Sequence, residues 1–481
     1  MANTRTEQLF DGAVSIENGT VVVNDASRIP GPHLDALVRV AVFGEDEERE
    51  DARWLIWELA QAVGIHPSSI HDLYIARGKG AYGDVTVPAI NVRGMAYDTA
   101  RAIFRVANRL NAGAFVLEIA RSEIAYTAQR PAEYATVMLA AALREGFRGP
   151  VFIQGDHFQL SAKKFAVDAT TEVNAVKQLA IEAMAAGFYN IDIDTSTLVD
   201  MSKPSLVEQQ RVNVQQCAEM AKYIRDNQRK GINISLGGEI GEVGTENSTP
   251  AELRTYMDGF NSLLQQIAPG AEGLSKVSVQ SGTSHGGVVL PDGSIKDVKI
   301  DFKTLEQLSE IARDEYGLAG AVQHGASTLP DELFHKFPPT GTCEIHLATN
   351  FQNMLYDHMP DALRGEIYKW LDENAKDERK AGDTDDQFFY KTRKKALGPF
   401  KRQIWEMPGD AKKALAKAYE DKFDFLFRQL NVGDTKSLVA RYVTLVEQHR
   451  PMPHPDLAVV AAAPDDADLS DGVGRLPTSM P

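Results

Sequence analysis

Short apolar runs alternate with longer amphipathic stretches over most of the chain, beginning near residue 85. The runs have the length of buried strands, and the stretches between them carry apolar residues at helical spacing, as in Tyr97–Arg109 and Thr171–Ala186. Strand signals that alternate with helix signals predict parallel strands joined by crossover helices. The eight runs are Val87–Val92, Ala114–Ile119, Pro150–Gly155, Tyr189–Ile193, Ile232–Gly238, Lys276–Ser281, Ala319–His324 and Cys343–Ala348.

The number of these units predicts a closed barrel. Eight strand–helix units over roughly 270 residues match the size of a (β/α)8 barrel. A doubly wound open sheet shows the same alternation, and periodicity alone does not exclude it. We therefore predict an α/β fold, with a (β/α)8 TIM barrel over residues 85–358.

The two ends of the chain lack this alternation of strand and helix signals. Residues 1–84 predict an α/β extension, with a hairpin in Ala13–Val23 around Asn18-Gly19 and a helix over Asp51–Val63. Residues 359–450 predict a helical region, and residues 451–481 a disordered tail that is rich in Pro, Ala and Asp. The helices expected after the barrel are 359–379, 410–429 and 436–449.

Composition narrows the possible partners. The 481 residues include 51 Lys and Arg against 67 Asp and Glu, a formal net charge of −16, which argues against nucleic acid as the main partner. No apolar run reaches the roughly 18 residues of a membrane span, and no secretory signal is visible. Two cysteines, Cys217 and Cys343, cannot build a disulfide framework, so we expect a reducing, cytoplasmic compartment.

Three of the eleven histidines fall at or just after the ends of predicted strands: His157, His285 and His324. In a barrel these ends meet on one face, where active sites are built. Three converging imidazoles suit a catalytic zinc ion with a fourth position open. Alternatively, each histidine is an ordinary polar residue of a loop.

Two of these histidines lie in loops of small residues. His285 lies in Ser281–Gly287, and His324 opens His324–Thr328. Exposed backbone N–H groups in such loops can bind a phosphate. The alternative is that the glycines only make tight turns.

Five separated motifs then resemble one family, in order and spacing. These motifs and the Pro88–Asn91 strand, together covering roughly residues 85–355, resemble the metal-dependent, class II fructose-bisphosphate aldolases. The motifs are Asp156-His157, Gly238–Gly241, Gly282–Gly286, His324–Ser327 and Ala348-Thr349.

The resemblance implies a barrel whose His157, His285 and His324 hold a divalent metal, usually zinc. Glu239 matches a carboxylate near that metal. The resemblance leaves open whether a monovalent cation binds as well. Asp156 would be the acid/base at the C4 hydroxyl of a ketose bisphosphate. We expect a homodimer or homotetramer. The implied substrate and phosphate contacts are Asn91, Gly286, Gly325, Ser327, His346 and Thr349.

A second acid/base is expected on the glycine-rich loop Gly241–Ser248. Asn247 falls at the family's glutamate position but cannot take up a proton, so we favour Glu246, with Glu242 second. A plain surface turn is the alternative interpretation of this loop. In the basic stretch 391–422, Lys395 and Arg402 are candidates for a second phosphate, although a solvated charged helix face explains them as well.

The chain also departs from the family pattern around the substrate. Metal ligands are kept while other positions differ, which favours metal chemistry on a different substrate. Asp194 and Ser196 match a further motif and are expected to support the site. The departures are Ala120, Gln154, Gly237, Glu344, His346 and Ala348.

We therefore expect an aldolase that reversibly cleaves a phosphorylated ketose, fructose 1,6-bisphosphate or a related sugar phosphate, into dihydroxyacetone phosphate and an aldehyde. Another metal-dependent sugar-phosphate lyase or epimerase is the first alternative. A non-catalytic aldolase-like subunit is the second.

Overall fold

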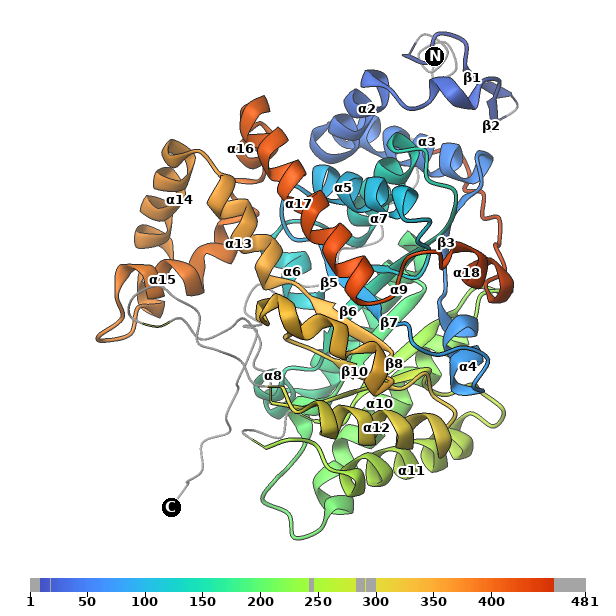
Figure 1. Ribbon diagram of the computed structural model, residues 1–481, viewed down its shortest axis with the longest axis vertical. Helices are drawn as coiled ribbons and strands as arrows, with labels where there is room; N and C mark the ends of the chain where they lie inside the picture. Colours follow the sequence, from blue (N-terminus) through green and yellow to red (C-terminus); the bar gives the residue numbers. More distant parts are fainter. Residues whose placement is uncertain (1–8, 18, 242–245, 283–289, 291–299, 454–481) are drawn as a thin grey trace.

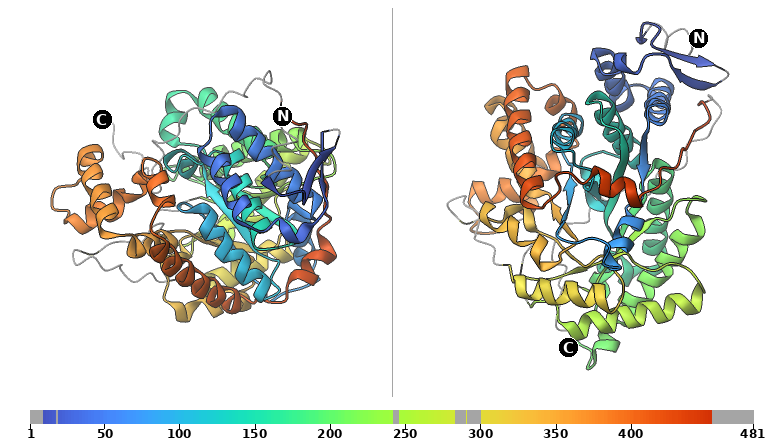
Figure 2. Two further views of the ribbon diagram at one scale, coloured as in Figure 1. Left: turned by 90° about the horizontal axis from the view of Figure 1, so that it is seen from above. Right: turned by 45° about the vertical axis from the view of Figure 1, so that its right-hand side comes forward.

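The computed structural model describes residues 9–453 apart from 18, 242–245, 283–289 and 291–299. A barrel forms its centre. The N-terminal elements lie at one end of the molecule, and α11 and α12 lie at the other (Figure 1). The helices after the barrel include α14 and α15, which project to one side in both Figure 1 and Figure 2.

Eight parallel strands close into the predicted barrel. Each pairs with its neighbour in chain order, β6 also pairs with β7, and the last strand pairs with the first through Glu344 opposite Val87. This closure confirms the TIM barrel and excludes the open sheet. The barrel strands are β4 (Val87–Asn91), β5 (Val116–Ala120), β6 (Gly149–Gln159), β7 (Asn190–Asp194), β8 (Ser235–Glu239), β9 (Lys276–Val279), β10 (Ala321–Gln323) and β11 (Glu344–Leu347).

Helices cover the outside of the barrel, as the amphipathic stretches predict. The helices of the barrel region are α5 (Ala96–Arg109), α6 (Arg121–Tyr126), α7 (Pro131–Arg144), α8 (Ala162–Val167), α9 (Ala169–Ala186), α10 (Leu206–Asn227), α11 (Pro250–Ile267), α12 (Phe302–Asp314) and α13 (Thr349–His358). Short 3-10 helices are η1 (Ala26–Arg28), η2 (Ser196–Leu198), η3 (Ala326–Thr328), η4 (Asp331–Lys336), η5 (Pro338–Thr340), η6 (Lys376–Glu378) and η7 (Arg393–Ala396).

Local capping residues fix where several of these helices begin and end. The Asp168 side chain accepts a hydrogen bond from the Thr171 backbone N–H at the start of α9, and Gly187 ends that helix at φ 105°. Thr249 and Glu252 bond each other reciprocally at the start of α11. The left-handed φ at the end of α9 favours glycine because it has no Cβ.

The N-terminal extension adds a layer beside the barrel. The predicted hairpin is confirmed as β1 (Val14–Glu17) paired antiparallel with β2 (Thr20–Val23). Next come α2 (Pro32–Phe43) and α3 (Asp46–Ala62), which pack on each other and on α7. Two elements of this region were not predicted from the sequence. They are β3 (Ile65–Ser68), a strand outside the closed ring that pairs parallel with β6, and the following α4 (His71–Gly78).

After the barrel come α14 (Asp361–Asn374), α15 (Asp385–Thr392), α16 (Lys401–Trp405), α17 (Gly409–Gln429) and α18 (Lys436–Tyr442). The helix expected over 436–449 was too long, because it ends at Tyr442. Residues beyond it run to α3, where Trp54 Nε1 donates to the Arg450 carbonyl at 2.9 Å and Trp57 Nε1 donates to the Gln448 carbonyl at 2.5 Å. These contacts hold the segment in a non-helical path.

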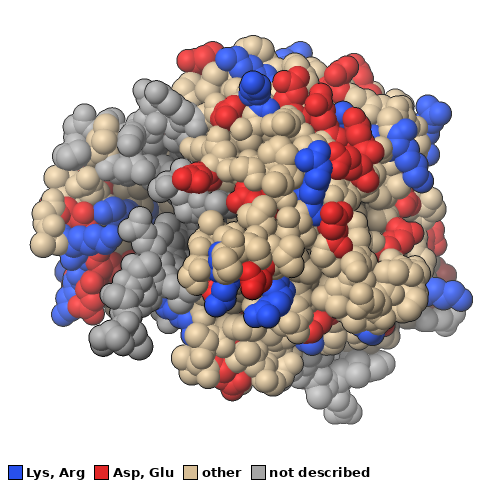
Figure 3. Space-filling model, turned by 90° about the horizontal axis from the view of Figure 1, so that it is seen from below, with Lys and Arg blue, Asp and Glu red and all other residues tan. Residues whose placement is uncertain are grey.

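The basic stretch 391–422 forms ion pairs within the chain. Lys395 pairs with Glu378, and the Arg402 guanidinium lies over the Phe43 ring at 4.5 Å. Lys412 Nζ lies 3.2 Å from an oxygen of Asp98. On the face drawn in Figure 3, acidic and basic side chains are interspersed. Among the described helices, none is long and apolar enough to cross a membrane.

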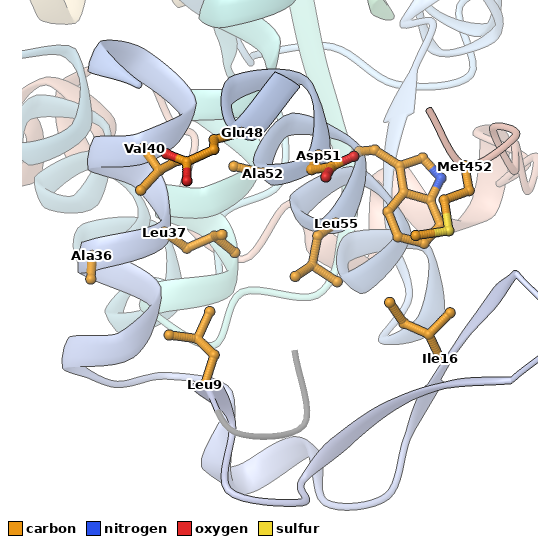
Figure 4. A pocket seen from close by; sticks show the side chains of 11 residues that line it. Leu9, Ile16, Ala36, Leu37, Val40, Glu48, Asp51, Ala52, Leu55 and Met452 are labelled. Carbon is orange, nitrogen blue, oxygen red and sulfur yellow. The ribbon is translucent and has the colours of Figure 1, made fainter. Parts of the chain in front are cut away.

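An apolar cavity of about 300 Å³ lies among the N-terminal elements (Figure 4). Leu37, Leu55 and Met452 line it, and the carboxylates of Glu48 and Asp51 lie beside it. Its lining residues lie between positions 9 and 55 or at Met452. The cavity is therefore separate from the strand ends that carry the predicted site.

Candidate active site

The end of β6 carries two adjacent side chains of the predicted site, Asp156 and His157. Side chains of a regular strand alternate between its faces, so both cannot normally point the same way. Here the register with β7 shifts between Gly155 and Phe158, and His157 adopts a left-handed φ of 41°. This bulge re-aims the two side chains. It also requires Gly155, since a Cβ there would lie 2.4 Å from the Phe158 ring.

His157 is held by carboxylates of the next two strands. Its Nδ1 lies 2.8 Å from Asp194 Oδ2 and 3.4 Å from Glu239 Oε2. Asp194 is itself fixed by the Gln159 amide at 2.6 Å and the Ser196 hydroxyl at 2.6 Å. A carboxylate on one ring nitrogen orients a ligating histidine and leaves Nε2 for a metal.

Two further imidazoles complete a row with His157. The His157 and His324 ring centroids are 4.5 Å apart, and the His324 and His346 centroids are 4.0 Å apart in a stacked arrangement. Ser278 Oγ lies 2.9 Å from His324 Nε2. The structure therefore brings together three histidines from β6, the end of β10 and β11.

His346 lies between carboxylates on both sides of its ring. Its Nε2 lies 2.7 Å from Glu344 Oε1, whereas its Nδ1 lies 3.0 Å from Glu118 Oε2 and 3.2 Å from Asp156 Oδ1. Burial would lower the pKa of His346, but the charges of Glu118 and Asp156 raise it well above its ordinary value. The ring thus connects the predicted acid/base to a deeper layer of the barrel.

Lys276 occupies that deeper layer. Its Nζ lies 2.8 Å from Gln154 Oε1 and 2.9 Å from Asp192 Oδ1, and it also contacts Glu344. Burial would lower the pKa of Lys276, but the charges of Asp192 and Glu344 raise it above its ordinary value. Burial likewise would raise the pKa of Glu344, but Lys276 and His346 lower it well below its usual range.

Burial, together with neighbouring acidic groups, raises the pKa of two carboxyls at the site. Burial raises the pKa of Glu118 to about 7, and the charge of Asp156 adds to the rise. Burial also raises the pKa of Glu239 to about 7, with the charge of Asp194 adding to it. So many acidic groups in one buried region favour a bound cation.

The donor set fits a divalent metal. Asp156, His157 and His324 offer ligand atoms that all lie within 4.8 Å of one another, as do His157, Asp194 and Glu239. Imidazole nitrogens and carboxylate oxygens are ligands that zinc accepts. The chemistry and grouping of these side chains agree with the metal predicted from sequence.

Other predicted site residues are placed as follows. Gly325, at φ 68°, opens the short helix η3, and the Ser327 hydroxyl accepts a hydrogen bond from the Thr349 backbone N–H at 3.1 Å. The Asn91 amide donates to Glu123 at 2.6 Å. Glu246 is exposed. His285, Gly286 and Glu242 lie outside the described residues.

Glu118 and Lys276 are not among the site residues predicted from the sequence, although a signal for them was present. Both are charged residues within apolar runs, and both are fully buried on barrel strands. Lys and Glu are rarely buried unless they are paired. Their positions alone therefore indicated a buried ion network inside the barrel.

The fold of this chain is similar to that of solved structures that share little sequence with it. A fructuronate-tagaturonate epimerase from Cohnella laeviribosi is 11% identical with a TM-score of 0.54, covering 80% of this chain and 86% of its own. A probable tagatose 6 phosphate kinase from Sinorhizobium meliloti is 15% identical with a TM-score of 0.52, covering 74% and 99%. A fructose-bisphosphate aldolase from Campylobacter jejuni is 16% identical with a TM-score of 0.45, covering 77% and 97%.

A comparison with curated proteins returned no match. The sequence profile described as "Fructose-bisphosphate aldolase class-II" matches residues 78–423. That range includes all eight barrel strands and the helices α5–α16. The chain therefore belongs to the class II fructose-bisphosphate aldolase family.

Proposed function

We propose that this protein is a metal-dependent aldolase that reversibly cleaves a phosphorylated ketose into dihydroxyacetone phosphate and an aldehyde. The observation that carries the proposal is the meeting of Asp156, His157 and His324 at the strand ends of a class II aldolase barrel. The ketose is fructose 1,6-bisphosphate or a related sugar phosphate.

In this proposal His157 and His324 hold the divalent metal, with His285 as the third imidazole. Glu239 is the nearby carboxylate that supports the metal or exchanges with it. A zinc ion bound there would act as a Lewis acid that stabilises the negative charge developing as the carbon–carbon bond breaks. Lys276 does not serve as an amine nucleophile, because its ammonium is buried in ion pairs.

Asp156 is the proposed acid/base at the C4 hydroxyl. A general base must be ionised and within reach of the proton that it takes. His346 Nδ1, 3.2 Å from Asp156 Oδ1, favours the ionised carboxylate. Glu246 is the proposed second acid/base, and Glu242 remains the alternative.

Phosphate binding is proposed for Gly286, Gly325, Ser327 and Thr349. Thr349 is the first residue of α13, and backbone N–H groups at a helix N-terminus attract anions. The Ser327 hydroxyl accepts a hydrogen bond from the Thr349 N–H, so the two residues lie side by side at the proposed phosphate site. Asn91 and His346 are the proposed further substrate contacts. A homodimer or homotetramer stays a prediction.

An epimerase, or another lyase acting on a different sugar phosphate, is the second candidate. His346 and Glu344 differ from the residues of the family pattern. His346 lies next to Asp156 and His324, and Glu344 contacts His346. The barrel that resembles this one with a TM-score of 0.54 belongs to a fructuronate-tagaturonate epimerase. A non-catalytic aldolase-like subunit is the remaining alternative.

A panel of phosphorylated ketoses tests the proposal. Released dihydroxyacetone phosphate is measured by a coupled assay, with and without a chelator and after metal is added back. The same panel is analysed for epimerised sugars. We expect cleavage that a chelator abolishes and zinc restores, and epimerisation without cleavage would favour the second candidate. The alternative of a non-catalytic subunit predicts neither product from metal-loaded protein.

A further inference from the structure

The buried ammonium of Lys276 lies beneath the candidate site and contacts side chains of three other barrel strands. Lys276 projects from β9 and is fully buried. It contacts Gln154 of β6, Asp192 of β7 and Glu344 of β11. Contacts that span the barrel interior fix the relative positions of these strands at that depth.

Glu344 transmits this contact to the site. The same oxygen, Oε1, that meets Lys276 also accepts the His346 Nε2–H at 2.7 Å. Its other oxygen accepts a hydrogen bond from the buried Tyr74 hydroxyl. Both oxygens are therefore occupied, so the carboxylate holds His346 in one orientation.

His346 in turn touches two residues of the proposed mechanism. Its ring stacks on His324 at 4.0 Å, and its Nδ1 lies 3.2 Å from Asp156 Oδ1. A continuous set of contacts therefore runs from Lys276 through Glu344 and His346 to a metal ligand and to the acid/base.

Gly237 on β8 leaves the space that the network occupies. A Cβ at this position would lie 2.2 Å from Asp192 Oδ1 and 2.9 Å from Lys276 Cε. Both distances are too short for real atoms, so any side chain would displace the Asp192–Lys276 pair. Gly237 and Glu344 are also two of the positions at which this chain departs from the family pattern.

We propose that Lys276 is a positioning residue: through Glu344 it holds His346 against His324 and Asp156, and so sets the geometry in which the substrate is bound and deprotonated. This inference rests on the proposed function. Buried ion networks are often no more stabilising than well-packed apolar groups of similar volume. A requirement for one orientation of His346 accounts for charges at these positions, whereas stability alone does not.

The test compares Lys276→Met with two variants that disturb the same network differently. Glu344→Gln removes the carboxylate charge, and Gly237→Ala introduces a clash without changing any charge. Lys401→Met is the matched control, because it removes a part-buried ion pair with Glu133 that holds the C-terminal helices to α7.

The readout is the His346 Nε2–H proton in the downfield NMR spectrum of the zinc-loaded resting protein, assigned by its loss in His346→Gln. We expect the signal to vanish or to exchange faster in Lys276→Met, Glu344→Gln and Gly237→Ala, and to stay in Lys401→Met. On a substrate found with the panel, kcat should fall about a hundredfold with little change in KM, as displacements of about 1 Å produce.

An unchanged signal in Lys276→Met and Gly237→Ala would overturn the proposal, as would an equal loss in Lys401→Met. Should Lys276→Met fail to fold, the Gly237→Ala and Glu344→Gln spectra decide the question. The spectra need no turnover. Failure to find any substrate would therefore count against the proposed function while leaving the positioning test intact.

Discussion

Replacing Asp156 with asparagine tests the proposed acid/base with little change of shape. The amide fills the same volume and can still contact His346, but it cannot take up a proton. It also removes one negative charge from beside Glu118, whose raised pKa owes part of its rise to Asp156. The proposal assigns the metal to imidazoles and not to Asp156, so folding and metal content should be preserved.

The expected loss of activity follows from the contribution that an acid/base residue makes to the rate. A positioned acid/base contributes about 10²- to 10⁴-fold to the rate, which corresponds to about 3–5 kcal/mol of activation free energy. We expect kcat/KM of Asp156→Asn to fall by at least about a hundredfold. The exposed residue Asp51 offers the control Asp51→Asn, for which we expect the wild-type rate.

The assay follows dihydroxyacetone phosphate release by stopped-time coupled detection, on protein whose metal content is measured in the same sample. A wild-type rate in Asp156→Asn would refute the assignment of Asp156. A lost rate accompanied by lost metal would also refute the reasoning, because it would show that Asp156 acts as a required ligand.

Two substitutions test how the structure supports this site. Gly155→Ala places a Cβ 2.4 Å from the Phe158 ring, so the free energy of unfolding should fall by about 1–3 kcal/mol and metal affinity should weaken. The control Gly365→Ala, on the open surface of α14, should be neutral. Trp57→Phe leaves the buried Gln448 carbonyl without its indole donor, and denaturant unfolding should show a loss of about 1–3 kcal/mol. Unchanged stability in either variant would contradict the corresponding packing argument.

The barrel could be predicted because its signal is local. Strands of a parallel barrel are covered on both faces, so each reads as a short apolar run whatever its partners. All eight runs became barrel strands. By contrast, Ile65–Ser68 contains His66, Pro67 and Ser68, and only pairing with β6 makes it a strand.

The end of the last helix shows the same limit. The sequence after Tyr442 continues a helical pattern toward His449, but residues 443–450 are not helical. Trp54 and Trp57 of α3 bond the backbone of this segment, and they lie almost 400 positions earlier. Such tertiary contacts override the local helix propensity, and nothing in the sequence of residues 443–450 itself indicates them.

At the site, the strand ends singled out His157 and His324, and the family resemblance added His346. The ion network below them was not predicted, because the partners of Lys276 come from β6, β7 and β11 and depend on closure of the barrel. The bulge that turns both Asp156 and His157 into the site likewise depends on the register with β7. The spacing of motifs along the sequence predicts how many strands the barrel has, but it does not give the register in which neighbouring strands pair.

Metal content per chain tests the central claim most directly, because it needs no knowledge of the substrate. Elemental mass spectrometry of purified wild-type protein, His157→Ala, His324→Ala and the exposed-histidine control His335→Ala would be compared after equal zinc loading and desalting. We predict one tightly bound divalent ion per chain in the wild type and in His335→Ala, and its loss in the other two. Equal metal in all four proteins would contradict the convergence of these imidazoles on one ion.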